Sequence, residues 1–379
     1  MMGNNNDLLL KNINADKPFP ICFDDLEEAV RDKIPFGPYG YIRSGAGGEE
    51  SLRNNRNAFK KYSIIPRFLN DVSTIDTSIE LFGKTHPTPF LFAPVGVNGM
   101  VHDDAEIAVV KAAEQLQMPY IQSTVTTFSL EEVAAAAPNH TKWFQLYWST
   151  NEEISYSMVK RAEEAGFEAI VLTIDTVMMG WREQDVRNQY SPLKKGFARG
   201  NYVNDPVFMA TLPDDSFDSY IEGLLSNFYH PTLTWEKVRE LKSRTKLPLL
   251  LKGILHPEDA KLAIEAGIDG IIVSNHGGRQ LDGVAGSLDA LPAVLDAVKG
   301  QIPVLLDSGV YRGIDALKAL ALGATAVAIG RPYIYGLAYD GQDGVRQIMT
   351  NIYEEFKVSM GLAGTKNMQE VRNLTLVRN

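Results

Sequence analysis

Short apolar runs recur along the chain, and segments with helical spacing of apolar positions separate them. Runs of this length with few charges are typical of strands that are buried on both faces of a parallel sheet. Most of the intervals between them fit one strand, one helix and two loops. The eight runs are Phe90–Gly96, Tyr120–Val125, Trp143–Trp148, Ala169–Asp175, Pro248–Ile254, Gly270–His276, Pro303–Gly309 and Ala326–Arg331.

Helices are predicted between these runs, because apolar positions return there every three or four residues. Two Glu-Ala-Gly sequences, at 164–166 and 265–267, end a predicted helix just before a strand, where glycine is a favoured C-terminal cap. The clearest helical patterns cover Ala105–Leu116, Glu152–Ala165, Pro257–Ala266, Leu288–Val298 and Ile314–Leu322.

Eight strand–helix units favour an α/β fold of the (β/α)₈ TIM-barrel type, here predicted over residues 90–364, over a doubly wound sheet. A dinucleotide-binding sheet would need a G-x-G-x-x-G turn after an early strand. The first run instead ends in PVGVNG, at residues 94–99. Residues 1–89 form an N-terminal extension, in which Phe23–Ile34 and Ser51–Lys61 have helical patterns. We expect the extension to close the bottom of the barrel or to reach its mouth.

One interval is far longer than the others, because Pro248 follows Asp175 by 73 positions. Residues 176–235 form an insertion after the fourth predicted strand, and much of this insertion lacks steady periodicity. A long insertion at one βα loop is typical of an active-site lid. A solvated excursion or an oligomer contact would leave the same pattern.

Composition narrows the class of protein. The 379 residues are 45% hydrophobic and 22% charged, as in ordinary globular proteins. A net charge of −10 argues against nucleic acid as a partner. No apolar run approaches the ~18 residues of a membrane span, and the start MMGNNND does not resemble a signal peptide. The lone cysteine, Cys22, excludes an internal disulfide and a cysteine-based metal site. We expect a soluble cytoplasmic protein with no metal and no membrane contact.

Polar residues end the predicted strands, and in such barrels the carboxyl ends of the strands form the active-site mouth. Lys252 is especially informative, because a buried ammonium needs a partner or a role. We therefore expect a functional site at this mouth. The strand-end residues are Ser123, Gln145, Tyr147, Thr173, Asp175, Lys252, Ser274, His276, Asp307 and Arg331.

His276 is the best candidate for a general base, since it alone among six histidines ends an apolar run. A free imidazole has a pKa of ~6.5, which suits proton transfer near neutrality. Asp175, at the end of another strand, would orient the ring and stabilise its charged form. A histidine satisfied within the core is the alternative.

Anion-binding groups surround this histidine in the sequence. Arg279 follows it by three residues, after two glycines, and a guanidinium there can bind a carboxylate through two parallel hydrogen bonds. Arg182 would bind the same carboxylate as a second guanidinium, unless it is a surface arginine. The seventh and eighth runs end in a pattern typical of a phosphate site in barrels, which predicts an anionic cofactor. These residues are Asp307, Ser308, Gly309, Gly330 and Arg331.

Two motifs give the sequence a family resemblance. SNHGGRQ at residues 274–280 and YIRSGAG at residues 41–47 resemble the FMN-dependent family that oxidises L-2-hydroxy acids. The likeness extends from about Phe23 to Gly364. It implies that residues 1–379 form a single FMN hydroxy acid dehydrogenase domain, that the cofactor is FMN, and that the chain is a homo-oligomer, a tetramer or octamer.

The resemblance also implies a role for each matching residue. His276 matches the base, Asp175 its partner, and Tyr147 a catalytic tyrosine. Substrate would be bound by Tyr41, Tyr147, Arg182 and Arg279. The flavin would lie against Pro94, Val95 and Gly96 and near Ser123, Gln145, Thr173, Lys252 and Ser274. Its ribityl chain and phosphate would be held by Asp307, Ser308, Gly309, Gly330 and Arg331.

Three features place the chain near the lactate-oxidising branches of this family. Gly96, the GWR sequence at 180–182 and the NYVNDPVF sequence at 201–208 resemble lactate 2-monooxygenase. Val125 departs from an aromatic residue common in the family, which puts the preferred substrate side chain in question. Tyr311 stands where the family usually has an arginine near the phosphate. No histidine precedes His86, which disfavours the haem-linked branch.

The implied activity is oxidation of L-lactate, or a similar short L-2-hydroxy acid, by O₂. The monooxygenase-like outcome gives acetate, carbon dioxide and water. The alternative is an L-lactate oxidase that gives pyruvate and hydrogen peroxide, and product residence under the lid would separate the two. His276 would take the hydroxyl proton if a hydride leaves the substrate, or the α-proton if a carbanion forms. A non-catalytic flavin- or phosphate-binding barrel is the candidate from another class.

Overall fold

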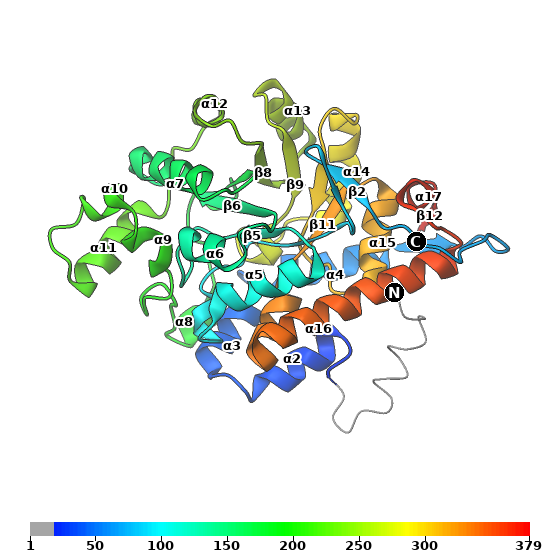
Figure 1. Cartoon of the computed structure of the whole chain (residues 1–379), viewed down its shortest axis with the longest axis horizontal. Helices are drawn as coiled ribbons and strands as arrows, with labels where there is room; N and C mark the ends of the chain where they lie inside the picture. Colours follow the sequence, from blue (N-terminus) through cyan, green and yellow to red (C-terminus); the bar gives the residue numbers. More distant parts are fainter. Residues whose placement is uncertain (1–18) are drawn as a thin grey trace.

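A closed barrel of parallel strands forms the centre of the molecule, as the sequence predicts (Figure 1). The computed structural model describes residues 19–379. The residues before Phe19, including the start on which the expectation of no signal peptide rests, lie outside the described part. The barrel strands are β4 Phe90–Phe92, β5 Tyr120–Gln122, β6 Lys142–Tyr147, β7 Ile170–Thr173, β8 Leu249–Ile254, β9 Gly270–Val273, β10 Val304–Leu306 and β11 Ala326–Ile329.

The barrel closes where β11 pairs with β4, through the register Val327 to Phe90. This closure excludes the doubly wound alternative. Six of the eight strands end two to four residues before their apolar runs do, because the chain turns there into the loops of the mouth. His276 and Ser308 lie in these turns with φ of 58° and 73°, a backbone conformation that residues other than glycine rarely adopt.

A helix follows each barrel strand, and five of these match predicted helices to within one residue. Gly166 and Gly267 end two of them with φ of 79° and 74°, as their Glu-Ala-Gly sequences predict. The helices are α5 Ala105–Leu116, α6 Leu130–Ala136, α7 Glu152–Glu164, α12 Trp235–Arg244, α13 Pro257–Glu265, α14 Ser287–Val298, α15 Gly313–Leu322 and α16 Arg331–Ala363.

The N-terminal extension meets both ends of the barrel. A hairpin of β2 and β3 lies at the bottom, where Phe82 packs edge-on against Trp143 at 5.5 Å between ring centroids. Helix α4 packs against η2, the short turn His276–Gly278 at the mouth. The extension comprises α2 Phe23–Arg31, α3 Phe36–Arg43, α4 Glu50–Lys60, β1 Tyr62–Ile65, β2 Ile79–Leu81 and β3 Lys84–His86.

The remaining elements frame the mouth and the C-terminal end. Strand β12 pairs antiparallel with β1 and so joins the end of the chain to the extension. These elements are η1 Asn98–Met100, η2 His276–Gly278, α17 Met368–Arg372 and β12 Thr375–Arg378. Within residues 19–379, none of the helices combines the length and the apolar character that crossing a membrane requires.

The insertion after β7 folds into short helices, although the sequence shows little periodicity there. They are α8 Glu183–Arg187, α9 Arg199–Val203, α10 Pro206–Met209 and α11 Phe217–Asn227. Figure 1 shows α9, α10 and α11 in green at one side of the barrel. Tyr202, Phe208 and Tyr220 form a small buried aromatic cluster among them.

Buried polar contacts tie the insertion to the barrel. The guanidinium of Arg161, on α7, donates to the carbonyl oxygen of Asn201 at 2.8 Å and to Asp205 Oδ2 at 3.1 Å. The Asn201 side chain donates to the carbonyl oxygen of Thr124, at the end of β5, at 2.9 Å. The side chain of Asp205 is fully buried, so its charge depends on Arg161 for compensation.

We expect Arg161→Met to lower the free energy of unfolding by about 3–5 kcal/mol, because it leaves the Asp205 carboxylate buried without its cation. Thermal or denaturant unfolding measures the loss, and limited proteolysis should cut first between residues 176 and 235. Lys160→Met is the matched control, since Lys160 faces solvent and reaches Glu164 only at 3.8 Å. Equal stability of the two variants would contradict the role of Arg161.

Candidate active site

A cavity of about 1270 Å³, including space open to solvent, lies at the mouth of the barrel. All four predicted substrate-binding residues line it, namely Tyr41, Tyr147, Arg182 and Arg279. It is also lined by His276, Pro94, Val95, Gly96, Lys252, Asp307, Ser308, Gly309, Gly330 and Arg331. The other predicted site residues, Ser123, Gln145, Thr173, Asp175 and Ser274, are outside the lining, and Asp175 and Ser274 bond to residues that form it.

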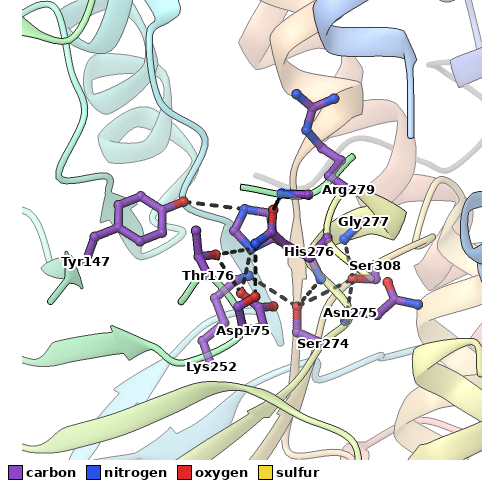
Figure 2. A network of polar contacts seen from close by, with 12 residues as sticks. Tyr147, Asp175, Thr176, Lys252, Ser274, Asn275, His276, Gly277, Arg279 and Ser308 are labelled. Atoms are coloured by element: carbon purple, nitrogen blue, oxygen red, sulfur yellow. Dashed lines mark hydrogen bonds and ion pairs between the residues drawn. The ribbon is translucent and has the colours of Figure 1, made fainter. Parts of the chain in front are cut away.

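His276 and Asp175 form the central contact of the site, with His276 Nδ1 2.8 Å from Asp175 Oδ1 (Figure 2). Since an ionised carboxylate only accepts hydrogen bonds, Nδ1 carries the proton and Nε2 is the basic nitrogen. Thr176 Oγ1 donates to the same carboxylate oxygen at 2.9 Å. The aspartate therefore fixes the tautomer of the ring.

Asp175 follows β7 and His276 follows β9, and strand β8 lies between these two strands. Strand β8 has a register shift against β9 between Lys252 and Ile254, and Gly253 within it has a φ of 118°. A Cβ at Gly253 would lie 2.8 Å from the Cβ of Asp175. A side chain at this position would clash with Asp175, so glycine is required here. The irregularity of the strand leaves the space that the aspartate occupies.

The environment keeps His276 neutral and Asp175 charged. Burial lowers the pKa of His276, and the charges of Lys252 and Arg182 act in the same direction against the opposing effect of Asp175. Burial would raise the pKa of Asp175, but the hydrogen bond from His276 and the charge of Lys252 hold it below its ordinary value. The pair is therefore set up as a neutral base supported by a carboxylate.

Tyr147 faces the basic side of the imidazole, with its hydroxyl 3.4 Å from His276 Nε2. Burial raises the pKa of this tyrosine, so it stays protonated and can donate a hydrogen bond. Its ring packs against Phe228 from the insertion, 5.0 Å between centroids. A hydroxyl donor and a nitrogen base thus meet at one point of the cavity.

Lys252 is held between two strand ends, and its side chain is almost fully buried. Its Nζ donates to Ser274 Oγ at 3.2 Å and lies 3.4 Å from Asp307 Oδ2. Ser308 Oγ donates to Asp307 at 2.8 Å and accepts from the backbone N–H of Gly277 at 2.9 Å. These bonds fix the ammonium at the floor of the cavity and position the turn that carries His276.

The two candidate substrate arginines have separate anchors. Arg279 Nη1 donates to the carbonyl oxygens of Tyr41 and Ser44 at 2.5 and 2.7 Å, at the C-terminal end of α3. Arg182 donates to the carbonyl oxygen of Arg279 and to Gln280 Oε1, both at 3.2 Å. Burial and the charge of Arg182 lower the pKa of Arg279 to about 10, so it stays charged at neutral pH.

Arg331 binds the same helix end. It donates to the carbonyl oxygens of Ile42, Ser44 and Gly277 at 2.9, 3.1 and 3.0 Å. The sequence predicts Arg331 as a phosphate contact, and the structure adds a second duty, which is to fix α3 against the mouth. A guanidinium has five N–H donors, so these bonds leave others for a ligand.

Comparison with known proteins identifies the family. Residues 30–378 match the model of the family described as FMN-dependent dehydrogenase. The chain is 74% identical to an L-lactate oxidase from Lysinibacillus sphaericus (strain C3-41), over 98% of this chain and 97% of that protein. It is 39% identical to 2-Hydroxyacid oxidase 1 from Homo sapiens, over 95% and 97% of the two chains.

The chain belongs to the FMN-dependent dehydrogenase family. A solved structure of a mandelate oxidase resembles it with a TM-score of 0.85 and 40% identity, over 95% of this chain and 99% of that one. The family resemblance seen in the sequence is therefore confirmed, as are the TIM barrel and the FMN cofactor. This family member is an enzyme of FMN-dependent 2-hydroxy acid oxidation.

The donor set fits this cofactor. Gln145 Nε2 and Thr173 Oγ1 are buried without a hydrogen-bond partner among the described residues, although buried polar atoms are rarely left so. Both belong to the predicted flavin-binding set, and Thr173 pairs in register with Lys252 on the neighbouring strand. An amide donor, a hydroxyl group and an ammonium suit the carbonyl oxygens and ring nitrogens of a flavin.

Several residues of the site were not predicted from the sequence. Thr176 bonds to Asp175 and Gln280 bonds to Arg182, and Gln280 is part of the SNHGGRQ motif that signals this region. The insertion contributes Met179, Ser191, Pro192, Leu193, Phe228 and Tyr229 to the cavity wall. The sequence offers no periodic signal that would have singled these residues out.

Gly96 also has a geometric explanation that the sequence does not reveal. A Cβ at this position would lie 2.5 Å from the carbonyl oxygen of Val125 and 2.6 Å from its side chain. The close approach of β4 and β5 loops therefore requires glycine here. The feature that resembles lactate 2-monooxygenase is thus also a packing requirement of this chain.

We predict that the acid limb of kcat/KM for the hydroxy acid has its midpoint below pH 6.5. Neutral His276 is the competent base, and it is lost as the pH drops through its pKa, which burial lowers from 6.5. Steady-state rates between pH 4.5 and 8, with folding checked by circular dichroism, measure the profile. An acid limb centred above pH 7 would show that another group, or a raised pKa, controls the reaction.

Proposed function

We propose that this chain oxidises L-lactate, or a similarly short L-2-hydroxy acid, with O₂ and releases pyruvate and hydrogen peroxide. One observation carries the proposal. The basic nitrogen of His276 and the guanidinium of Arg279, whose Nη2 is buried without a partner among the described residues, belong to the same cavity. The name of the relative with 74% identity, L-lactate oxidase, supports the choice of substrate.

The carboxylate of the substrate pairs with Arg279 and Arg182 in this proposal. Arg279 Nη2 lacks a partner among the described residues, and a carboxylate oxygen satisfies it. The aromatic ring of Tyr41 lies under both guanidinium groups, 4.5 Å from Arg279 and 5.9 Å from Arg182. The ring therefore stiffens a pair of cations that would otherwise repel one another.

His276 then acts on the other end of the substrate. Its Nε2 accepts the hydroxyl proton, or the C2 proton in the alternative sequence of events, and Asp175 stabilises the imidazolium that results. Tyr147 donates to the hydroxyl oxygen and keeps it directed at Nε2. The proton thus moves to a nitrogen whose tautomer is fixed before the substrate arrives.

Bound FMN supplies the electron acceptor, and O₂ is the terminal oxidant. Pro94, Val95 and Gly96 would face the ring, with Ser123, Gln145, Thr173, Lys252 and Ser274 around its polar edge. The charge of Lys252 favours electron density at that edge. Asp307, Ser308, Gly309, Gly330 and Arg331 would hold the ribityl chain and phosphate, using backbone N–H groups and the free donors of Arg331.

The insertion serves as the lid in this proposal. Phe228 and Tyr229, which follow α11, line the cavity together with Met179 and Leu193. Such a cover excludes water from the proton transfer and controls product release. A longer stay of pyruvate would let peroxide decarboxylate it, which is the lactate 2-monooxygenase outcome. Because packing against Val125 accounts for Gly96, this glycine no longer argues for the monooxygenase outcome. We therefore favour release of pyruvate.

Product analysis decides between these outcomes. Purified enzyme, shown to contain FMN by extraction, is mixed with L-lactate in air without catalase. We expect one pyruvate and one hydrogen peroxide for each O₂ consumed, with D-lactate as the inactive control. Acetate and carbon dioxide in place of peroxide would assign the chain to the decarboxylating branch. A flavin that L-lactate does not bleach without oxygen would refute lactate oxidation altogether.

A further inference from the structure

Asp185 is a buried carboxylate that the proposed reaction does not use. It lies on the first turn of α8, three residues after Arg182, and α8 packs against α3, which carries Tyr41. Asp185 is only 7% exposed. Within residues 19–379, neither of its carboxylate oxygens has a hydrogen-bond partner. Buried carboxylates are usually paired, so this one requires an explanation.

The charges that act on Asp185 are those of the two candidate substrate arginines. Burial raises the pKa of Asp185, and the charges of Arg279 and Arg182 oppose this effect. Asp185 in turn interacts electrostatically with both arginines and with Tyr190 beside Tyr41. No ion pair within 4.0 Å joins Asp185 to either guanidinium in the described part of the chain.

Asp185 is therefore not what holds the arginines in place. Arg279 is fixed by the carbonyl oxygens of Tyr41 and Ser44, and Arg182 by the carbonyl oxygen of Arg279 and by Gln280. None of these bonds involves the side chain of Asp185. What Asp185 supplies is a negative charge in a buried region, where charges act over longer distances than in water.

We propose that Asp185 limits how tightly the arginine pair binds carboxylates and so shortens the stay of the 2-oxo acid product. This inference rests on the proposed function, because it assumes that the arginine pair binds the carboxylate. A negative charge behind the pair repels a bound anion and weakens the potential that attracts it. A product that is held less firmly leaves before peroxide can react with it. Asp185 thus favours release of pyruvate over decarboxylation.

Asp185→Asn tests the inference, because the amide keeps the size of the side chain and removes its charge. Pyruvate is titrated into the FMN-containing enzyme, and perturbation of the flavin absorbance reports binding. We expect pyruvate to bind about threefold to tenfold more tightly to the variant. Loss of structure would weaken binding, so the direction separates the two explanations. Pyruvamide, a neutral analogue, should bind parent and variant equally.

Two further variants control the result. Glu183→Gln removes a charge from an exposed side chain on the same helix, where Glu183 pairs with Arg187, and should bind pyruvate as the parent does. Asp185→Glu keeps the charge and should also resemble the parent. If Asp185→Asn folds poorly, Asp185→Ser provides a second neutral side chain with the same expected tightening.

The outcomes distinguish this inference from the function on which it rests. Pyruvate binding to Asp185→Asn that is unchanged or weaker, while the parent binds pyruvate, would overturn the role of Asp185 alone. Equal tightening of pyruvate and pyruvamide would also overturn it, because a charge effect acts on the anion. A parent flavin that L-lactate does not reduce in the absence of oxygen would instead refute the proposed function.

Discussion

The hydrogen bond between His276 Nδ1 and Asp175 Oδ1 is the contact on which the site depends. It joins the loops that follow β7 and β9, which are separated by β8. The irregularity of β8 at Gly253 leaves room for the side chain of Asp175. The left-handed turn at His276 places the ring over the cavity, at φ 58°. Serine hydroxyls fix this turn: Ser274 accepts from the N–H of His276, and Ser308 from that of Gly277. These hydrogen bonds hold the unfavourable backbone conformation of His276, and Ser274 also accepts a hydrogen bond from Lys252.

A second constraint comes from the C-terminal end of α3. The carbonyl oxygen of Ser44 accepts hydrogen bonds from both Arg279 and Arg331. The negative end of a helix dipole favours such cations. One helix of the N-terminal extension therefore fixes the candidate substrate arginine and the candidate phosphate arginine together. This explains why a barrel enzyme keeps a segment outside its repeat so close to its mouth.

Much of this arrangement follows from the sequence. All eight barrel strands, five helices of the barrel and the meeting of polar residues at one mouth are predicted from apolar periodicity and strand ends. The short helices of the insertion are not, because they form around their own small cluster of Tyr202, Phe208 and Tyr220 rather than along a repeating face. The irregularity at Gly253 and the anchoring of the arginines also escape prediction. They depend on contacts between residues far apart in sequence, which no local pattern encodes.

The central claim is that His276, oriented by Asp175, is the base that begins the oxidation. The most direct test is to measure the rate at which L-lactate reduces the flavin of His276→Gln without oxygen, using stopped-flow absorbance. Glutamine keeps a polar side chain at this position but cannot accept the proton, so FMN content should match the parent. We expect reduction to slow by about 10²- to 10⁴-fold. Reduction within tenfold of the parent rate, at full FMN content, would contradict the account.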